Sequence, residues 1–341
     1  MRWQQLQDIY QKRGIALALG AGVSFDSKLP NWIGLLERIG SKCLGVDGDK
    51  TVARLMAEGF SLPAIASMLR LRCPSDIKFS DLVRDALYQK FEPYKQRNVS
   101  GVDLEKLVEV ACSKNYTLRA VAALCARWDE NTASFFRNDK IHAIVNFNLD
   151  ALLREYVAAR YRRVLVRTVE RASKSRDPEK ISIYYMHGFL RFDSKANDPD
   201  KEAFDKLVLS EQEYFDFFNS PTSLFNYTFL YVLREYSCLF IGLSMQDDNI
   251  RRLLHYSKKE RQVGYEEEKK EKKEEESSPD EVKEKLLRHF AVIKEYDSGE
   301  LKDLVEISLA ELGVNVLWIS DYQDIPKKLE LMYGADWRKV Y

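Results

Sequence analysis

The feature that most constrains this chain is a series of short apolar runs separated by longer segments with helical spacing. The runs that predict strands are IALALG at 15–20, IHAIVNF at 141–147, ISIYYMH at 181–187, KLVLS at 206–210, CLFIGLS at 238–244, HFAVIKEY at 289–296 and VNVLWIS at 314–320. Helical patterns such as ALLREYVAARY and SLFNYTFLYVLREY lie between several of them. Short buried strands that alternate with helices predict an α/β fold, with a mainly parallel sheet of the Rossmann type.

One long helical stretch interrupts this alternation. A helix is predicted at about 31–43, where apolar residues recur on one face. From 46 to 140 the pattern is helical almost throughout, with prolines between the segments. We therefore expect a single domain over residues 1–341 that carries a large helical insertion subdomain at 46–140.

A charge-dense segment covers residues 257–285. Its sequence, KKERQVGYEEEKKEKKEEESSPDEVKEK, mixes acidic and basic residues closely enough for pairs at i,i+4. We interpret it as an exposed helical or flexible insertion, because such runs are usually solvated surface. The alternative interpretation is an arm that docks a partner.

The charge balance and hydropathy restrict the classes of function. Lysine plus arginine and aspartate plus glutamate are equal at 53 each, which argues against a chain-wide attraction to nucleic acid. No apolar run reaches the roughly 18 residues that a membrane helix needs. The opening residues are polar and lack the apolar core of a secretory signal. We expect a cytoplasmic protein that binds neither membrane nor, directly, nucleic acid.

The cysteines and histidines indicate neither disulfides nor a metal. None of the five cysteines belongs to a C-x-x-C pair, so buried or half-buried thiols are expected. The four histidines are too dispersed to indicate a metal site, and we expect no structural zinc.

The first motif with chemical content is Gly20-Ala21-Gly22-Val23-Ser24, directly after the first predicted strand. A strand that leads into a glycine turn and then a helix offers backbone N–H groups to a phosphate. The motif is not a full G-x-G-x-x-G fingerprint, because the third glycine is absent. Glycine turns also occur for purely steric reasons.

Three further strand ends carry polar residues. Asn146-Phe147-Asn148-Leu149-Asp150 follows a strand and opens a helix, so these side chains either face a ligand crevice or cap the helix. His187 is followed by a glycine at another strand end, where an imidazole can act as an acid or base or serve as a structural polar group. The segment Gly242–Asp247 ends a strand with small and polar residues that could line a ribose site.

In this order, the segments G-A-G-x-S, N-x-D, H-G and G-x-S-x-x-D resemble the motifs of the sirtuin-like superfamily, especially its prokaryotic NAD-hydrolysing branch from antiviral defence. The LPNW segment at 29–32 and the run AIVNFNLDALL add to the resemblance, which extends from about Ile15 to the strand VNVLWIS. Four spaced motifs in one order are more specific than any single motif. The resemblance implies a Rossmann-type fold that takes NAD as its substrate.

The resemblance also implies which residues bind NAD. The expected binding residues are Gly20, Ala21, Gly22, Ser24, Asn148, Gly242 and Ser244. The glycine turn and Ser24 would approach the phosphates and the adjacent ribose, and Ser244 would lie near the adenosine ribose.

The catalytic roles implied by the resemblance fall on three residues. Asn148 would contact the nicotinamide ribose and position the attacking water, and His187 would act on a ribose hydroxyl as a base or hydrogen-bond partner. Asp150 would orient the nicotinamide end or stabilise the pocket. Asp247 is assigned a structural role.

The chain departs from the family pattern in several places. Asn146 and Phe147 replace the usual threonine and glutamine, and Lys28 replaces the glycine before the Leu-Pro segment. The paired zinc cysteines of protein-deacylating sirtuins are missing, which argues against deacylation because the zinc module helps to form the peptide cleft.

The predicted function is therefore that of an NAD glycohydrolase, which depletes NAD as an antiphage effector in abortive infection. The alternatives are an NAD-dependent ADP-ribosyltransferase or deacylase, and a non-catalytic sensor subunit for NAD or ADP-ribose. A metal is not required, because nicotinamide in NAD is already a cationic leaving group. The resemblance further implies a homo-oligomer and a separate sensor protein, such as a HerA-type hexameric ATPase or a short Argonaute-type protein.

Overall fold

The fold is built around a seven-stranded parallel sheet. The computed structural model describes residues 2–169, 177–193, 207–219, 224–272 and 286–341. The strands of the sheet are β1 (Ile15–Leu19), β4 (Ile141–Asn146), β5 (Val166–Val169), β6 (Ile181–Tyr185), β7 (Cys238–Ile241), β8 (His289–Lys294) and β9 (Val314–Ile319). They lie in the order β5-β6-β4-β1-β7-β8-β9, and each neighbouring pair is parallel. The predicted α/β, Rossmann-type class is confirmed.

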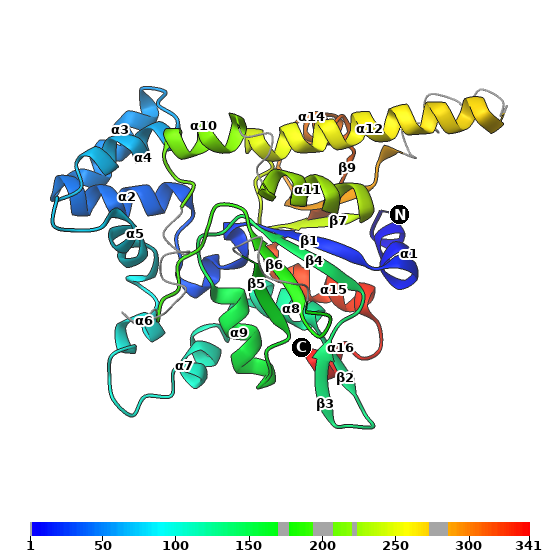
Figure 1. The fold of residues 1–341 in the computed structure, drawn as a ribbon, viewed down its shortest axis with the longest axis horizontal. Coiled ribbons are helices and arrows are strands. Elements are labelled where there is room, and N and C mark those ends of the chain that lie inside the picture. The colour runs from blue at the N-terminus through cyan, green and yellow to red at the C-terminus, as the bar shows by residue number, and fades with distance from the viewer. Residues whose placement is uncertain (1, 170–176, 194–206, 220–223, 273–285) are drawn as a thin grey trace.

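Helices cover both faces of this sheet and extend beyond one end. They are α1 (Arg2–Arg13), α2 (Trp32–Leu44), α3 (Gly48–Ala57), α4 (Leu62–Leu71), α5 (Phe79–Tyr88), α6 (Glu92–Gln96), α7 (Leu104–Ala111), α8 (Tyr116–Cys125), α9 (Leu152–Tyr161), α10 (Glu211–Asn219), α11 (Leu224–Glu235), α12 (Asp248–Lys272), α14 (Gly299–Ala310), α15 (Ile325–Tyr333) and α16 (Trp337–Val340). Three short 3₁₀ turns are η1 (Ala21–Val23), η2 (Phe25–Ser27) and η3 (Tyr322–Asp324). Figure 1 shows α11 and α12 on one side of the sheet and α9 and α15 on the other.

The alternation of side chains along β1 shows why the sheet needs two helical layers. Ile15, Leu17 and Leu19 belong to a hydrophobic cluster shared with α8, α9 and α15. Ala16 and Ala18 point into a second cluster, shared with α11 and α12. A strand that is buried on both faces has a continuous apolar sequence, as β1 has in IALAL.

The connections between strands identify the ligand crevice of the fold. After β1 the chain goes to β4 on one side, whereas after β7 it goes to β8 on the other side. The change of direction falls between β1 and β7. In open α/β sheets, ligands bind outside the carboxyl ends of the strands at such a switch point.

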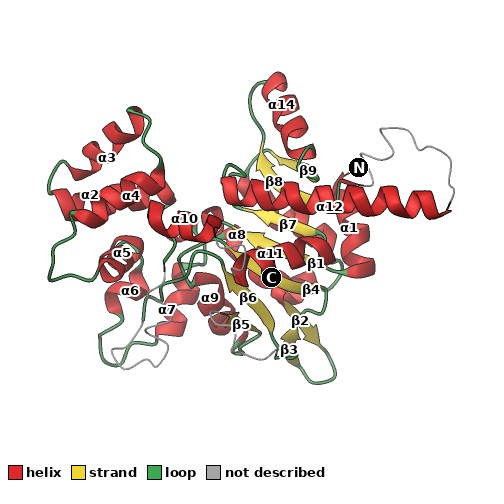
Figure 2. Ribbon diagram, turned by 45° about the horizontal axis from the view of Figure 1, so that its top comes forward, coloured by secondary structure: helices red, strands yellow, loops and turns green. Residues whose placement is uncertain are grey.

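Helices α2 to α6 lie beyond this edge of the sheet, as both ribbon views show (Figures 1 and 2). Helices α3 to α8 fall within the predicted insertion at 46–140, but α8 packs against the face of the sheet. The helical pattern predicted up to residue 140 is wrong at its end, because β2 (Ala126–Asp129) and β3 (Ser134–Arg137) form an antiparallel hairpin. Aromatic side chains stabilise this hairpin: the rings of Trp128 and Phe135 lie 4.9 Å apart on opposite strands.

Two other strand predictions also need correction. Residues 207–210, the described part of the run predicted at 206–210, are not a strand, although Leu207 and Leu209 are buried. Conversely, β5 was not predicted. It is a four-residue edge strand with only its first and last residues buried, so it lacks the continuous apolar run of the central strands.

The charge-dense segment starts within a long helix. Residues 257–272 form the second part of α12, and the remainder of the predicted insertion, 273–285, lies outside the described residues. The described helices include none with the length and apolar character needed to cross a bilayer. The five cysteines are free thiols, three of them buried and two half-buried, as the sequence predicts.

Lys28 adopts a backbone conformation that favours glycine. It ends η2 with φ 67° and ψ 17°, in the left-handed region. Lys28 replaces the glycine of the pattern that the sequence resembles, and glycine adopts this conformation without strain. A side chain with a Cβ is disfavoured there by about 1–2 kcal/mol.

Replacing Lys28 with glycine should therefore stabilise the protein. We expect Lys28→Gly to raise the free energy of unfolding by about 0.5–1 kcal/mol, since the relief of backbone strain exceeds the added entropy of the unfolded chain. Lys28→Ala, which keeps a Cβ, is the control and should change little. Urea denaturation measures both, and equal stabilities of the two variants would contradict the backbone argument.

Candidate functional site

The predicted motifs converge on one edge of the sheet. They follow β1, β4, β6 and β7, which are neighbours in the order β6-β4-β1-β7. Because these strands are parallel, their carboxyl ends meet at the same edge, on the side of the helical insertion (Figure 1). This is the edge that contains the switch point.

Close backbone packing explains the glycines at this edge. A Cβ on Gly20 would lie 2.5 Å from the Gly242 carbonyl oxygen, and one on Gly22 would lie 2.7 Å from the Gly242 Cα. Gly242 itself has φ 71°. The three glycines are therefore required by the contact between the turn after β1 and the end of β7.

The same contact limits which groups of the turn can bind a phosphate. The N–H of Gly20 donates to the Ile241 oxygen and that of Gly22 to the Gly242 oxygen, each over 3.0 Å. Two 3₁₀ turns follow the glycines, and the helix expected to present its N-terminus begins only at Trp32. The N–H groups of Gly20 and Gly22 are thus already hydrogen-bonded at the end of β7. Toward a ligand, these two glycines can only allow a close approach to their backbone.

A buried asparagine that the sequence analysis missed holds this turn. The Nδ2 of Asn115 donates to the Val23 oxygen at 2.9 Å and to the Ser27 Oγ at 3.0 Å. Its Oδ1 accepts from the N–H of Leu118 and so caps α8. The available signal was an asparagine before a helical pattern, which predicts a cap but not the bonds to a turn about 90 residues earlier.

Ser24 and Asp150 are bonded to each other. The Ser24 Oγ donates to the Asp150 Oδ1 at 3.0 Å, and the N–H of Leu152 donates to the same oxygen at 3.0 Å. Both side chains are buried. Burial raises the pKa of Asp150 to about 6, although the two hydrogen bonds oppose this shift. Asp150 is not the N-cap of α9, which is Ala151, but it accepts from the first residue of that helix and from the Ser24 hydroxyl that was expected to face NAD.

Asn148 is the polar group at this edge that is ready to accept a hydrogen bond. Its N–H donates to the Asn146 Oδ1 at 3.1 Å, which fixes the chain after β4. Its Oδ1 is buried and has no hydrogen-bond partner among the described residues. Buried polar atoms are almost always paired, so an exception in a ligand crevice points to a ligand or water that supplies the donor.

His187 lies on the neighbouring strand end, enclosed by aromatic rings. Its ring centroid is 5.6 Å from that of Phe147 and 5.7 Å from that of Tyr214. Burial lowers the pKa of His187, and the Asp247 carboxylate together with a hydrogen bond to the Phe147 backbone opposes this shift. The imidazole is therefore neutral at neutral pH.

Tyr214 of α10 covers His187 and was missed by the sequence analysis. Its hydroxyl donates to the Asp247 Oδ2 at 2.9 Å, while the Asp247 Oδ1 accepts from the N–H of Ile250 at the start of α12. On its other side, the ring of Tyr214 meets Trp32 of α2 edge-on at 6.2 Å. No local pattern distinguishes this tyrosine, because its partners lie far away in the chain.

Helix α10 is in turn attached to the helical insertion. The N–H of Glu211 donates to the Ser67 Oγ of α4 at 3.0 Å, and Glu213 forms an ion pair with Arg70 of the same helix. Contacts from the insertion therefore position the ring that covers His187.

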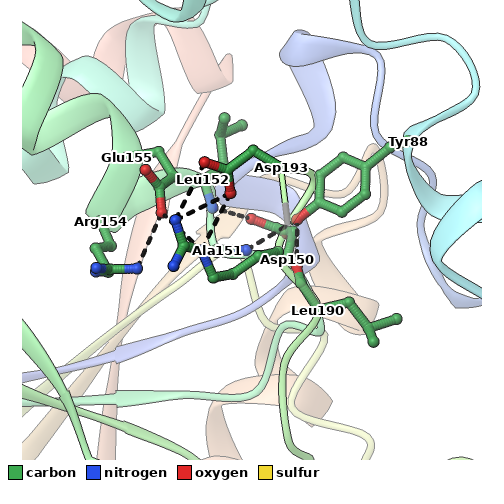
Figure 3. Close-up of polar contacts among 9 residues, drawn as sticks. Tyr88, Asp150, Ala151, Leu152, Arg154, Glu155, Leu190 and Asp193 are labelled. Carbon is green, nitrogen blue, oxygen red and sulfur yellow. Dashed lines mark hydrogen bonds and ion pairs between the residues drawn. The ribbon is translucent and has the colours of Figure 1, made fainter. Parts of the chain in front are cut away.

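Tyr88 of α5 ties together the loops that follow β4 and β6 (Figure 3). Its hydroxyl donates to the Leu190 oxygen at 2.7 Å and accepts from the N–H of Ala151 at 3.0 Å. Burial raises the pKa of Tyr88 well above its ordinary value, so the hydroxyl keeps its proton. Ala151 follows Asp150 directly, and Leu190 lies three residues after His187. The hydroxyl thus fixes the spacing of two candidate catalytic loops.

The remaining predicted residue, Ser244, lies at the surface. It is exposed, and its Oγ accepts from the N–H of Gln246 at 3.4 Å within a turn where Met245 has φ 59°. Ala21 is half-buried in the turn after β1. Among the residues that the structure describes, no three histidine, cysteine, aspartate or glutamate side chains are grouped so that they could hold a metal ion.

Comparison with known proteins locates one family. Residues 142–303 match the family model of the SIR2-like domain. The match begins in β4 and ends in α14, so it includes Asn148, Asp150 and His187 and leaves out the glycine turn. No curated protein matches the chain.

The burial of Asp150 predicts an unusual pH dependence of stability. Because its pKa is about 6 in the folded protein and near 3.8 when unfolded, the folded state binds more protons between these values. The wild type should therefore lose stability as the pH rises from about 4 to about 6. Asp150→Asn keeps the acceptor oxygen without the charge, and we expect it to be about 1–3 kcal/mol more stable than the wild type at pH 7.5.

Urea denaturation at pH 4.5 and pH 7.5 measures this difference, which should shrink at the lower pH. Asp103→Asn is the matched control, since Asp103 caps α7 at an exposed position through the N–H of Lys106. A lower stability of Asp150→Asn at pH 7.5, with no change in the control, would contradict the assigned cost of the buried carboxylate.

Proposed function

We propose that the chain, whose residues 142–303 match the family model of the SIR2-like domain, is an NAD glycohydrolase. SIR2-like domains use NAD as a substrate, and the family match includes the strand ends that carry Asn148 and His187. The proposed reaction cleaves the bond between nicotinamide and ribose and releases nicotinamide and ADP-ribose.

The observation that carries this proposal is the amide oxygen of Asn148, which is buried beside the strand end of His187 and has no hydrogen-bond partner in the described part of the chain. Asn148 and His187 each lie two residues beyond the paired residues Asn146 and Tyr185 of the adjacent strands β4 and β6. A hydrogen-bond acceptor without a partner fits a ribose hydroxyl or a water molecule, both of which supply a donor. The residues present therefore fit a ribose in the crevice.

The chemistry needs little from the protein beyond placement and charge stabilisation. The C1′–N bond breaks with its electron pair moving to the nicotinamide nitrogen, which neutralises the positive charge of the ring. The water oxygen bonds to C1′ and releases one proton. An oriented water in a closed, low-dielectric pocket lowers the barrier of such a step.

In this scheme, Asn148 and His187 act directly and Asp150 acts through structure. The Asn148 Oδ1 accepts a hydrogen bond from the ribose or the water, and the neutral His187 accepts one from a ribose hydroxyl. The carboxylate of Asp150 is held by Ser24 and by the start of α9, so it positions the loop after β4.

The burial of the site supports a gate. Asn148 and His187 are only 6% and 3% exposed, and the ring of Tyr214 lies against His187. NAD therefore reaches the site only after this cover moves. Since α10 is attached to α4, we propose that the helical insertion controls access through Tyr214.

A gated NAD hydrolase suits an antiphage effector, because unregulated activity would deplete the NAD of the host cell. We propose that assembly into a homo-oligomer and a separate sensor protein open the gate during infection. A HerA-type ATPase or a short Argonaute-type protein is the kind of partner that the family resemblance suggests.

Nicotinamide release from NAD tests the proposed reaction. Purified protein, alone and with candidate partners, should release nicotinamide and ADP-ribose in equal amounts. We expect Asn148→Ala and His187→Ala each to reduce the rate by about 100-fold or more. His255→Ala is the matched control, since His255 is exposed on α12.

The same chromatographic assay separates the alternatives. Release that survives both substitutions would overturn the site assignment. Nicotinamide release that depends on an added acyl-lysine peptide or protein acceptor would indicate a deacylase or an ADP-ribosyltransferase. Tight binding of NAD without release under any condition would indicate a sensor.

Substitution of Tyr214 tests the gate. We expect Tyr214→Ala to raise kcat/KM for NAD several-fold in the isolated protein, because the ring that covers His187 is removed. Tyr214→Phe keeps the ring and loses only the bond to Asp247, so its effect should be smaller. A fall of kcat/KM in both variants would show that Tyr214 assists binding or chemistry rather than blocking access.

A further inference from the structure

A cavity lies at the end of the sheet where the strands begin, opposite the end that carries Asn148 and His187. It has a volume of about 840 Å³ and is lined by α1, the turn into β1, residues 235–237 before β7, Arg261 of α12 and residues 287–288 before β8. Figure 1 places α1 at this end, away from helices α2 to α6. Its size falls within the range of pockets that bind small molecules. Because the strands are parallel, it is separate from the NAD site proposed above.

The cavity has an excess of positive charge. Its cationic lining residues are Lys12, Arg13, Arg261 and Arg288. Among the described residues, none of these four is part of an ion pair. Two acidic residues also line it, but Glu235 pairs with Arg234 at 3.2 Å and Asp8 accepts a bond from Gln4. Among the described residues, the four cations around the cavity outnumber its two carboxylates, of which Glu235 also acts on Arg288.

Among the four cations that line the cavity, Arg261 has the least favourable surroundings for a charge. Its Nε and Nη2 are buried without a hydrogen-bond partner among the described residues. Burial and the neighbouring Arg288 guanidinium lower the pKa of Arg261 to about 10. A buried cation without a counter-charge is destabilising, and proteins normally pair such groups.

The contacts of the Arg261 Nη1 do not compensate its charge, because the Leu233 oxygen and the Ser257 Oγ, each at 3.4 Å, are neutral acceptors. The same Nη1 lies 2.9 Å from the His289 Nε2, while the His289 Nδ1 faces the N–H of Cys238 at 3.2 Å. Both ring nitrogens therefore face N–H donors, and a neutral imidazole can accept from only one of them. Burial, Arg261 and Arg288 lower the pKa of His289 well below its ordinary value, so the ring is neutral and supplies no counter-charge.

Arg288 holds its guanidinium at the same place through neutral acceptors. Its two terminal nitrogens donate to the carbonyl oxygens of Arg234 and Glu235 at the end of α11. Burial lowers the pKa of Arg288, Cys238 and the Glu235 carboxylate oppose this shift, and the charge of Arg13 adds to it. Two fixed guanidinium groups with two further cations beside them are suited to a multiply charged anion.

We propose that this cavity binds the phosphate groups of a small phosphorylated molecule of nucleotide size. The anion supplies the counter-charge that Arg261 lacks among the described residues, and adds to that of Glu235 at Arg288. Phosphate suits the site better than carboxylate, since the four cations exceed the two lining carboxylates by more than one charge. The ligand binds at the end of the sheet remote from Asn148 and His187, so the site is independent of the proposed NAD hydrolysis.

Thermal unfolding and calorimetry test this site with two probes, sodium pyrophosphate and ATP with a chelator present. We expect either probe to raise the Tm by about 3–5 °C at 100-fold excess over its Kd, compared with sodium chloride at equal ionic strength. A shift with both indicates that phosphate alone suffices, and a shift with ATP alone indicates a nucleotide. Arg261→Met should abolish the extra shift, and without ligand its Tm should equal or exceed that of the wild type.

A second variant and a control keep the test decisive. Lys12→Gln combined with Arg13→Gln changes only the exposed end of α1. For whichever of pyrophosphate and ATP binds the wild type, this double variant should raise the Kd at least fivefold. Arg338→Gln, at an exposed arginine of α16, should leave it unchanged. The proposal is overturned if neither probe exceeds sodium chloride, or if both cavity variants bind the probe as tightly as Arg338→Gln does.

Discussion

The close contact between the glycine turn after β1 and the end of β7 is the constraint on which the site depends. Gly20 and Gly22 donate to the carbonyls of Ile241 and Gly242, so the turn extends the pairing of the two strands past the end of the sheet. A single Cβ at Gly22 or Gly242 would separate the two segments. This contact lies at the switch point, and from there the neighbouring strands β4 and β6 set the positions of Asn148 and His187.

The site concentrates polar groups whose burial is unfavourable. Burial raises the pKa of Asp150 to about 6 and lowers that of His187, and the Asn148 oxygen has no partner among the residues that the structure describes. Hydrogen bonds from distant helices offset part of this cost, above all those of Asn115 in the turn and of Tyr88 between the two loops. Such a shell fixes the geometry of the buried polar groups in advance, at the expense of stability.

The central part of the fold was predictable from sequence because it depends on local patterns. The buried strands β1, β4, β7, β8 and β9 are continuous apolar runs, and parallel pairing then brings their ends together. The edge strand β5 and the hairpin of β2 and β3 are short and half-buried, so their patterns were ambiguous. An apolar run at 207–210 was buried by packing without joining the sheet.

The composition of the site was predictable only in part. Motif order selected Asn148, Asp150 and His187, which are all buried at one edge of the sheet. The bond between Ser24 and Asp150 joins residues 126 positions apart, and nothing in either segment indicates it. Tyr88 and Tyr214 likewise contribute from separate helices. Roles that arise from long-range packing leave no local signal, whereas strand ends and caps do.

Helix α12 runs between the two edges of the sheet, from the carboxyl ends of the strands to the cavity where the strands begin. It starts beside Asp247, which receives the hydroxyl of Tyr214, and reaches Arg261 about 20 Å further along its axis. One continuous helix therefore contacts both edges of the sheet, so a shift of α12 at one edge would also move its residues at the other. If a ligand at each edge moves α12, thermodynamic reciprocity applies: each ligand changes the affinity of the other by the same factor.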